Sequence, residues 1–132
     1  MELLLHFSEY SICKLHSVDE IPCACPPAFM AITKEEISLV CHRCDLPEHL
    51  IKASHGWRLF QIGGTLDFSM TSIISNISGI LAEANVSIFV ISTYNTDYFM
   101  VKEENVEMAV LYLEESGHCV CFLQEAEEEK EA

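Results

Sequence analysis

The sequence lacks the features that would place the chain in a membrane or on a secretory route. Its 132 residues contain no apolar run that approaches the roughly 18 to 20 residues needed to span a bilayer. The opening MELLLHF has neither a basic n-region nor a small-residue cleavage site. We therefore expect a soluble cytoplasmic protein of about one domain, or of two very small domains that share a core.

Positive charge is scarce as well. Seven Lys and Arg residues stand against 21 Asp and Glu residues, which gives a formal net charge of −14. A field of this sign repels nucleic acid and anionic membranes, so we expect the protein to bind neither. Part of the excess lies in EAEEEKEA at 125–132, which has too few apolar residues to order itself and predicts a disordered acidic tail.

Recognisable catalytic machinery is the third absence. The six histidines lie at positions 6, 16, 42, 49, 55 and 118, and no pair has the i, i+4 spacing of a helical metal site. No Ser or Cys stands in a nucleophile motif, and GGTLD at 63–67 lacks the Gly-Lys-Ser ending that holds phosphates. We expect a protein that is not an enzyme and that carries no cofactor.

Clear periodicity begins at residue 57. Period-two alternation and helical spacing predict the order β-α-β-β-α-β, with the elements GWRLFQI, a helix with one apolar stripe from Met70 to Ala84, VSIFVIST, TDYFMV, a helix in EENVEMAVLYLEESG that ends at Gly117, and HCVCFL. This order is the ferredoxin-like pattern, in which two helices cover one face of four antiparallel strands.

Residues 1–55 are predicted to be mainly strand. The candidates are LLLHF, YSICKL, FMAIT and EISLVC, followed by a brief helical turn that Pro47 opens. A piece of this size is too small to be stable alone. We expect it to share the sheet of the larger half and to cover the face that the helices leave open. The predicted division is 1–55, 56–123 and a tail at 124–132.

Three stretches together resemble the ACT domain family: GWRLFQIGGTLDFS, ISGILAEANVSIFVISTYNTDYFMV and EENVEMAVLYLEESGH. The resemblance is to small two-ACT proteins similar to the regulatory part of aspartate kinases and to cytosolic arginine sensors. YSICKL and FMAITKEEISLVC resemble the abbreviated first unit of that group. The resemblance implies an α+β fold, namely a ferredoxin-like ACT βαββαβ sandwich with an abbreviated, mainly-β ACT-like N-terminal half.

The resemblance also implies a ligand site. ACT domains bind amino acids between the strand-to-helix loop of one unit, here 63–72, and the second hairpin of another, here 92–97. The residues that it assigns to the ligand are Ser69, Thr71, Ser72, Thr93, Tyr94, Asn95 and Asp97. Free N–H groups at the helix start would hold an α-carboxylate, and Asp97 would face a cationic end. Met70 stands where arginine sensors carry an acid, so the resemblance does not single out arginine.

The polar hairpin has a simpler interpretation. Asn95 and Asp97 suit a turn, and Ser92 and Thr93 can satisfy neighbouring backbone groups. Without the resemblance, the residues favour this turn; with it, a ligand-facing hairpin is slightly favoured.

Seven cysteines, an odd number in a chain without a secretion signal, indicate reduced thiols. Cys41 and Cys44 form a C-x-x-C motif that, with Cys23 and Cys25, could bind zinc or act in redox chemistry. However, Cys41 continues the apolar alternation of the strand before it, which favours a place in the core, and C-x-C spacing does not suit a zinc knuckle. Period-two spacing places Cys119 and Cys121 on one face, more typical of packing than of ligation.

Three functional hypotheses follow. The first is a non-catalytic regulatory protein that binds a small ligand, an amino acid, between ACT units, as a homodimer or docked on a regulated protein partner. Ligand binding would then act allosterically by stabilising one arrangement of the units. The second is an interaction or dimerisation module without a ligand. The third is a zinc or redox protein centred on Cys41 and Cys44.

Overall fold

The computed structural model of the chain describes residues 1–21, 25–63 and 70–123, with the backbone alone at 70–72. Its strands and α-helices are β1 (Glu2–Leu15), β2 (Phe29–Ile32), β3 (Ile37–His42), β4 (Lys52–Ile62), α1 (Met70–Glu83), β5 (Phe89–Ser92), β6 (Asp97–Lys102), α2 (Val106–Glu115) and β7 (Cys119–Leu123). Short 3₁₀ turns are η1 (Val18–Glu20), η2 (Arg43–Asp45) and η3 (Glu103–Asn105).

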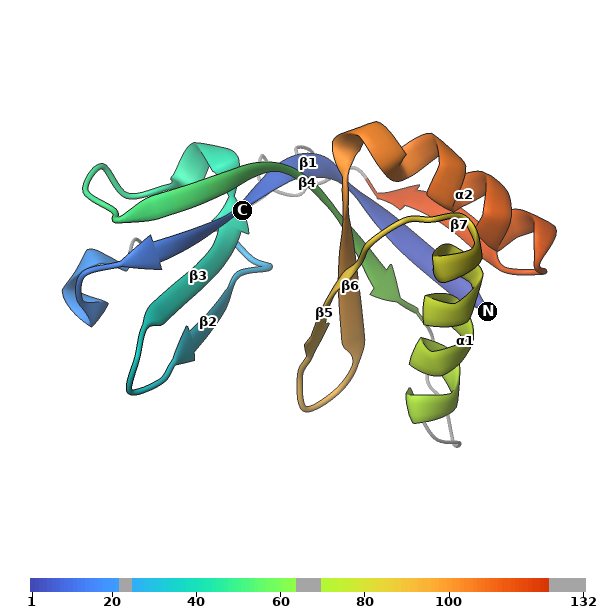
Figure 1. Cartoon of the computed structure of the whole chain (residues 1–132), viewed down its shortest axis with the longest axis horizontal. Coiled ribbons are helices and arrows are strands. Elements are labelled where there is room, and N and C mark those ends of the chain that lie inside the picture. The colour runs from blue at the N-terminus through green and yellow to red at the C-terminus, as the bar shows by residue number, and fades with distance from the viewer. Residues whose placement is uncertain (22–24, 64–69, 124–132) are drawn as a thin grey trace.

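All the described strands belong to one sheet with the order β2-β3-β1-β4-β6-β5, to which β7 is added by pairing with β1. The long strands β1 and β4 run through both halves of the molecule and pair along most of their length (Figure 1). The first part of β1 therefore lies between β4 and β7, and its pairing with β7 is parallel. The ferredoxin-like unit is present, but its last strand is separated from its first by a strand of the N-terminal half.

A change of register in the middle of β1 explains why one strand serves both halves. Its pairing with β4 shifts between Leu5 and Glu9 and again between Tyr10 and Ile12. Such bulges bend a strand and change which face its side chains point to. Because the alternation of apolar and polar residues is interrupted there, the sequence predicts two strands, LLLHF and YSICKL, whereas the structure has one continuous strand.

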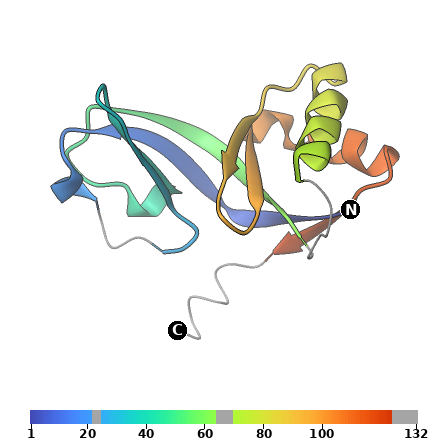
Figure 2. The same ribbon diagram turned by 90° about the horizontal axis from the view of Figure 1, so that it is seen from below.

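The larger core lies between the sheet and the two α-helices, which cover the same face of it (Figures 1 and 2). The predicted stripe of α1 is confirmed, because Ile73, Ile77 and Leu81 are buried there. From the sheet, Phe60 and Phe99 are fully buried and stack with ring centroids 4.7 Å apart and an interplanar angle of 4°. Each buried ring contributes about 1.5–3 kcal/mol of transfer free energy.

The second core joins the two halves on the other face of the sheet. Tyr10, Val40, Leu59 and Met100 are buried together. In addition, the ring of Phe29 from β2 lies with its centroid 4.9 Å from that of Tyr98 on β6. The β2–β3 hairpin thus packs against the β5–β6 hairpin, as expected for a small half that covers the face without helices.

The segment before β4 differs from its prediction. Residues 46–51 form bends and not a helical turn, and β4 begins at Lys52. Pairing of Lys52 with Lys14 and of Ala53 with Cys13 draws this segment into the sheet, so tertiary contacts override the local signal of Pro47. The predicted division at 55/56 falls inside β4, and the tail at 124–132 lies outside the described residues. Within the described ranges, no helix is long and apolar enough to cross a membrane.

Candidate functional site

The predicted site begins where β4 ends, at Gly63. The Gly63 N–H donates to the carbonyl of Glu2 at 2.9 Å, which fixes the end of β4 against the start of β1. A Cβ at this position would lie 3.3 Å from the Glu2 carbonyl oxygen and 3.3 Å from a Glu2 carboxylate oxygen. The close approach of two backbones therefore favours glycine here. The loop that follows, 64–69, lies outside the described residues, and with it Ser69.

Helix α1 supplies the second part of the site. It begins at Met70, where the predicted apolar stripe begins, so Thr71 and Ser72 belong to its first turn. No acidic residue stands in this turn. The first N–H groups of a helix have no intrahelical acceptor and carry a partial positive charge, which suits a carboxylate.

The turn between β5 and β6 is held by its own threonine. Thr93 donates its hydroxyl to the Thr96 carbonyl at 2.9 Å and accepts from the Thr96 N–H at 3.3 Å, while the two backbones pair through Thr93 N–H at 2.9 Å. The side chain of Thr93 thus stabilises the turn, as expected if this hairpin is polar for structural reasons alone. Its only hydroxyl hydrogen is already donated to the Thr96 carbonyl.

Thr96 ties this hairpin to the end of β4. Its hydroxyl donates to the carbonyl of Ile62 at 3.0 Å, across 34 positions of sequence. The hairpin, the end of β4 and the start of α1 consequently lie at the same end of the C-terminal half (Figure 1). Sequence reasoning assigned no ligand role to Thr96, and its only signal was its place beside Asp97.

Asp97 is the most unusual residue of the hairpin. It opens β6, pairs with Ser92, and is only 7% exposed. Buried carboxylates are normally paired, because desolvation without a partner is costly. Asp97 thus differs from Thr93, Tyr94 and Asn95, which are exposed, and a cationic partner would offset the cost of its burial.

Tyr94 and Asn95 occupy the tip of the turn, apart from Asp97. Tyr94 is 103% exposed, and Asn95 is exposed too. A fully exposed aromatic ring gains nothing from the fold itself. The structure thus places Asp97 with Thr96 and Ile62 at the base of the hairpin and leaves these two side chains in solvent.

The competing cysteine motif is divided between core and surface. Cys41 is fully buried in a small cluster with Cys13, Leu15 and Leu39, as its alternation predicts, whereas Cys44 is exposed. Burial raises the pKa of the Cys41 thiol to about 12, and nearby Cys13 adds to the shift. A redox-active thiol needs the opposite shift. Within the described ranges, which exclude Cys23, no group of three or more His, Cys, Asp or Glu residues is placed to hold a metal ion.

Cys119 and Cys121 do share one face of β7, but they do not pack in a core. Cys119 is exposed and Cys121 is half-buried, with their sulfurs 3.9 Å apart. Cys121 also lies 3.6 Å from a carboxylate oxygen of Glu2. The expected packing role is thus wrong for Cys119, which is exposed, and only partly met by Cys121.

Comparisons with known proteins agree with this architecture. Residues 52–115 match the family model described as ACT domain. The cytosolic arginine sensor for mTORC1 subunit 1 of Homo sapiens is 37% identical over 68 residues, which are 49% of this chain and 21% of that protein. The chain therefore spans about a fifth of the length of that relative.

Two solved structures extend the likeness beyond the matched domain. A protein from Agrobacterium tumefaciens superposes with a TM-score of 0.83 and 25% identity over 92% of both chains. The aspartate kinase of Clostridium acetobutylicum, described as an allosteric enzyme, gives a TM-score of 0.61 at 14% identity over 84% of this chain and 33% of that one. The second likeness concerns the fold alone.

Proposed function

Because residues 52–115 belong to the ACT domain family, we propose that the chain is a non-catalytic regulatory protein that binds an amino acid between ACT units. The name of the matched human relative, a cytosolic arginine sensor, supports an amino acid as the ligand and the cytosol as the location.

The observation that carries the proposal is the burial of Asp97, which is 7% exposed. Asp97 lies at the base of a hairpin that Thr96 holds against the end of β4, and α1 begins at the same end of the unit. A ligand with a carboxylate at one end and a cation at the other matches these two partial sites. The helix start would receive the α-carboxylate and Asp97 the cationic group.

A homodimer follows from the way in which ACT units would share the ligand. Both described α-helices, α1 and α2, lie in the C-terminal half, and residues 1–21 and 25–63 contain none. The described part of the chain thus has one complete βαββαβ unit. We propose that a second copy supplies the other unit, and that the ligand stabilises one arrangement of the two copies. Any regulated protein partner would bind preferentially to that arrangement.

A thermal-shift screen of the purified protein against the twenty amino acids tests the proposal, starting with arginine and lysine. A ligand at 100 times its dissociation constant adds about 2.7 kcal/mol when it binds only the folded state. Asp97→Asn should remove that shift while the protein still folds. Asp19→Asn, a matched change at an exposed position of η1, should retain it.

Two results would overturn the proposal. One is the absence of a shift with every amino acid. The other is an equal shift in the wild type and in Asp97→Asn, which would place the ligand elsewhere.

A further inference from the structure

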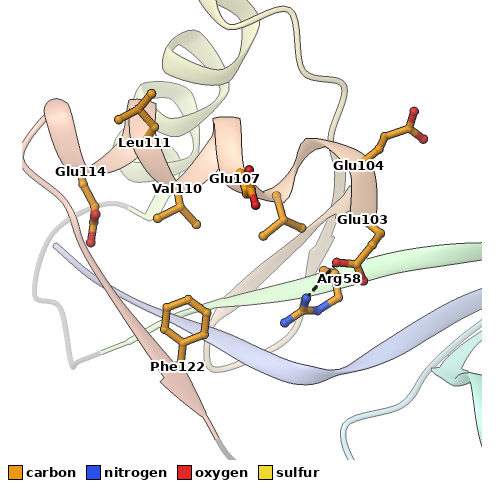
Figure 3. A pocket seen from close by; sticks show the side chains of 9 residues that line it. Arg58, Glu103, Glu104, Glu107, Val110, Leu111, Glu114 and Phe122 are labelled. Atoms are coloured by element: carbon orange, nitrogen blue, oxygen red, sulfur yellow. Dashed lines mark hydrogen bonds and ion pairs between the residues drawn. The ribbon is translucent and has the colours of Figure 1, made fainter.

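A second candidate site lies away from the hairpin, between α2 and β7. It is an open groove of about 700 Å³ (Figure 3). Its lining residues come from β4, η3, α2 and β7: Arg58, Glu103, Glu104, Val106, Glu107, Val110, Leu111, Glu114 and Phe122. None of them belongs to the predicted amino-acid site, so the groove has no part in the proposed function.

The groove offers an apolar surface that the fold leaves uncovered. Phe122 is 67% exposed and Leu111 50% exposed, and Val110 lies between them on the wall formed by α2 (Figure 3). In β7, Phe122 stands opposite Leu5, which is fully buried beneath the helices. Phe122 lies on the same face but beyond the cover of α2. Exposed apolar surface rimmed by polar residues is typical of an interaction site.

Arg58 adds a specific donor to this apolar surface. Its guanidinium donates to the Glu103 carboxylate at 3.2 Å and to the His6 carbonyl at 3.0 Å. Its side chain is 13% exposed, and its buried Nε–H has no acceptor among the described residues. A buried donor without an acceptor is costly.

The rim carries the opposite charge. Four carboxylates line the groove, from Glu103, Glu104, Glu107 and Glu114, against the one guanidinium of Arg58. Glu103 already pairs with that guanidinium, so three carboxylates remain for an incoming molecule. They favour a cationic occupant. They also disfavour a second copy of this chain, whose formal net charge is −14.

We propose that this groove binds an extended segment of a partner protein in which basic residues flank a large apolar side chain. The apolar side chain lies against Phe122, Leu111 and Val110. The basic side chains pair with Glu107 and Glu114. An open groove lined on one side by a helix and on the other by a strand suits a peptide.

The test starts from a random peptide library displayed on phage and selected on the full chain. Selected sequences should combine Lys or Arg with Leu, Phe or Trp. The most enriched peptide is then synthesised with a fluorescein label, and its affinity is measured by fluorescence anisotropy. Added NaCl should weaken binding, because the pairs on the rim are exposed.

Groove variants decide where the peptide binds. The double reversal Glu107→Lys with Glu114→Lys should weaken it by about tenfold or more, and so should Phe122→Ser. Matched controls are Glu35→Lys with Glu83→Lys, both exposed and outside the groove, and Met30→Ser, which is 50% exposed on β2. These controls should bind like the wild type. All the changed residues are exposed, so circular dichroism should show that every variant folds.

Three outcomes would overturn the proposal: no enriched peptide, enriched peptides without basic residues, or an affinity that the groove variants leave unchanged. Asp97→Asn should bind the peptide like the wild type. That variant separates the groove from the amino-acid site, so either proposal can fail while the other stands.

Discussion

The second core packs the two halves of the molecule together, so a change in this core should destabilise both halves. Val40 lies on β3 in the N-terminal half, is 5% exposed, and packs with Leu59 and Met100 of the C-terminal half. Val40→Ala removes two methyl groups, which costs about 1.6 kcal/mol of transfer free energy at about 0.8 kcal/mol each. The remaining cavity raises the loss in free energy of unfolding to about 2–3 kcal/mol. The melting temperature should fall by roughly 5 to 12 °C.

Two probes read the two halves during urea unfolding. Ellipticity at the helical band reports α1 and α2, which lie in the C-terminal half. Fluorescence of Trp57, the one tryptophan of the chain, reports the second core, against which it packs. If β1 and β4 make the halves one cooperative unit, Val40→Ala should move both midpoints equally and leave the m-value unchanged.

The reasoning is refuted if the helical signal keeps its wild-type midpoint while Trp57 fluorescence moves. That result would mean that the C-terminal half unfolds independently. Ile32→Ala is the control, because Ile32 is 58% exposed on β2 and its truncation should change stability by less than about 0.5 kcal/mol.

Three further predictions concern the hairpin and the thiols. Thr96→Val keeps the shape of the side chain but removes the hydroxyl that donates to the Ile62 carbonyl. The free energy of unfolding should fall by about 1 kcal/mol, and amide hydrogen exchange in the β5–β6 hairpin should become faster. Unchanged exchange rates would contradict this prediction. Cys41, with a pKa of about 12, should stay unalkylated by iodoacetamide at pH 8 in the folded protein while exposed Cys44 reacts, as mass spectrometry of the digested protein would show. Because the pKa of Cys41 is raised above its ordinary value of 9.0, its contribution to stability should be lost as pH rises from about 9 to 12, and Cys41→Ala should lessen that loss.

The C-terminal half could be predicted because its signals are local. The stripe of α1 and the end of α2 at Gly117, which has φ +98°, depend on spacing and on one residue of special conformation. The place of β1 could not be predicted in this way. Its pairing with β7 places Glu2 beside Cys119. The periodicity of a sequence shows that a segment is a strand but not which distant strand it pairs with.

The structure separates the residues that the resemblance assigns to the ligand. The resemblance placed Thr93, Tyr94 and Asp97 together as ligand residues. In the structure, Thr93 is used by the turn, Tyr94 is in solvent, and only Asp97 is buried. Burial of a carboxylate depends on what packs around it, which a sequence without its contacts does not specify. The groove behind α2 was missed for the same reason, since Phe122 and Arg58 are 64 positions apart.

The parallel pairing of β1 with β7 has a consequence for synthesis on the ribosome. β1 is made before β7, yet the edge of its first part, Glu2–His6, has no partner until Cys119–Leu123 has been made. An edge strand with free N–H and C=O groups is a template for wrong pairing. Contacts between positions so far apart in sequence also form slowly. The nascent chain must therefore keep this edge of β1 from wrong pairing until β7 has been made.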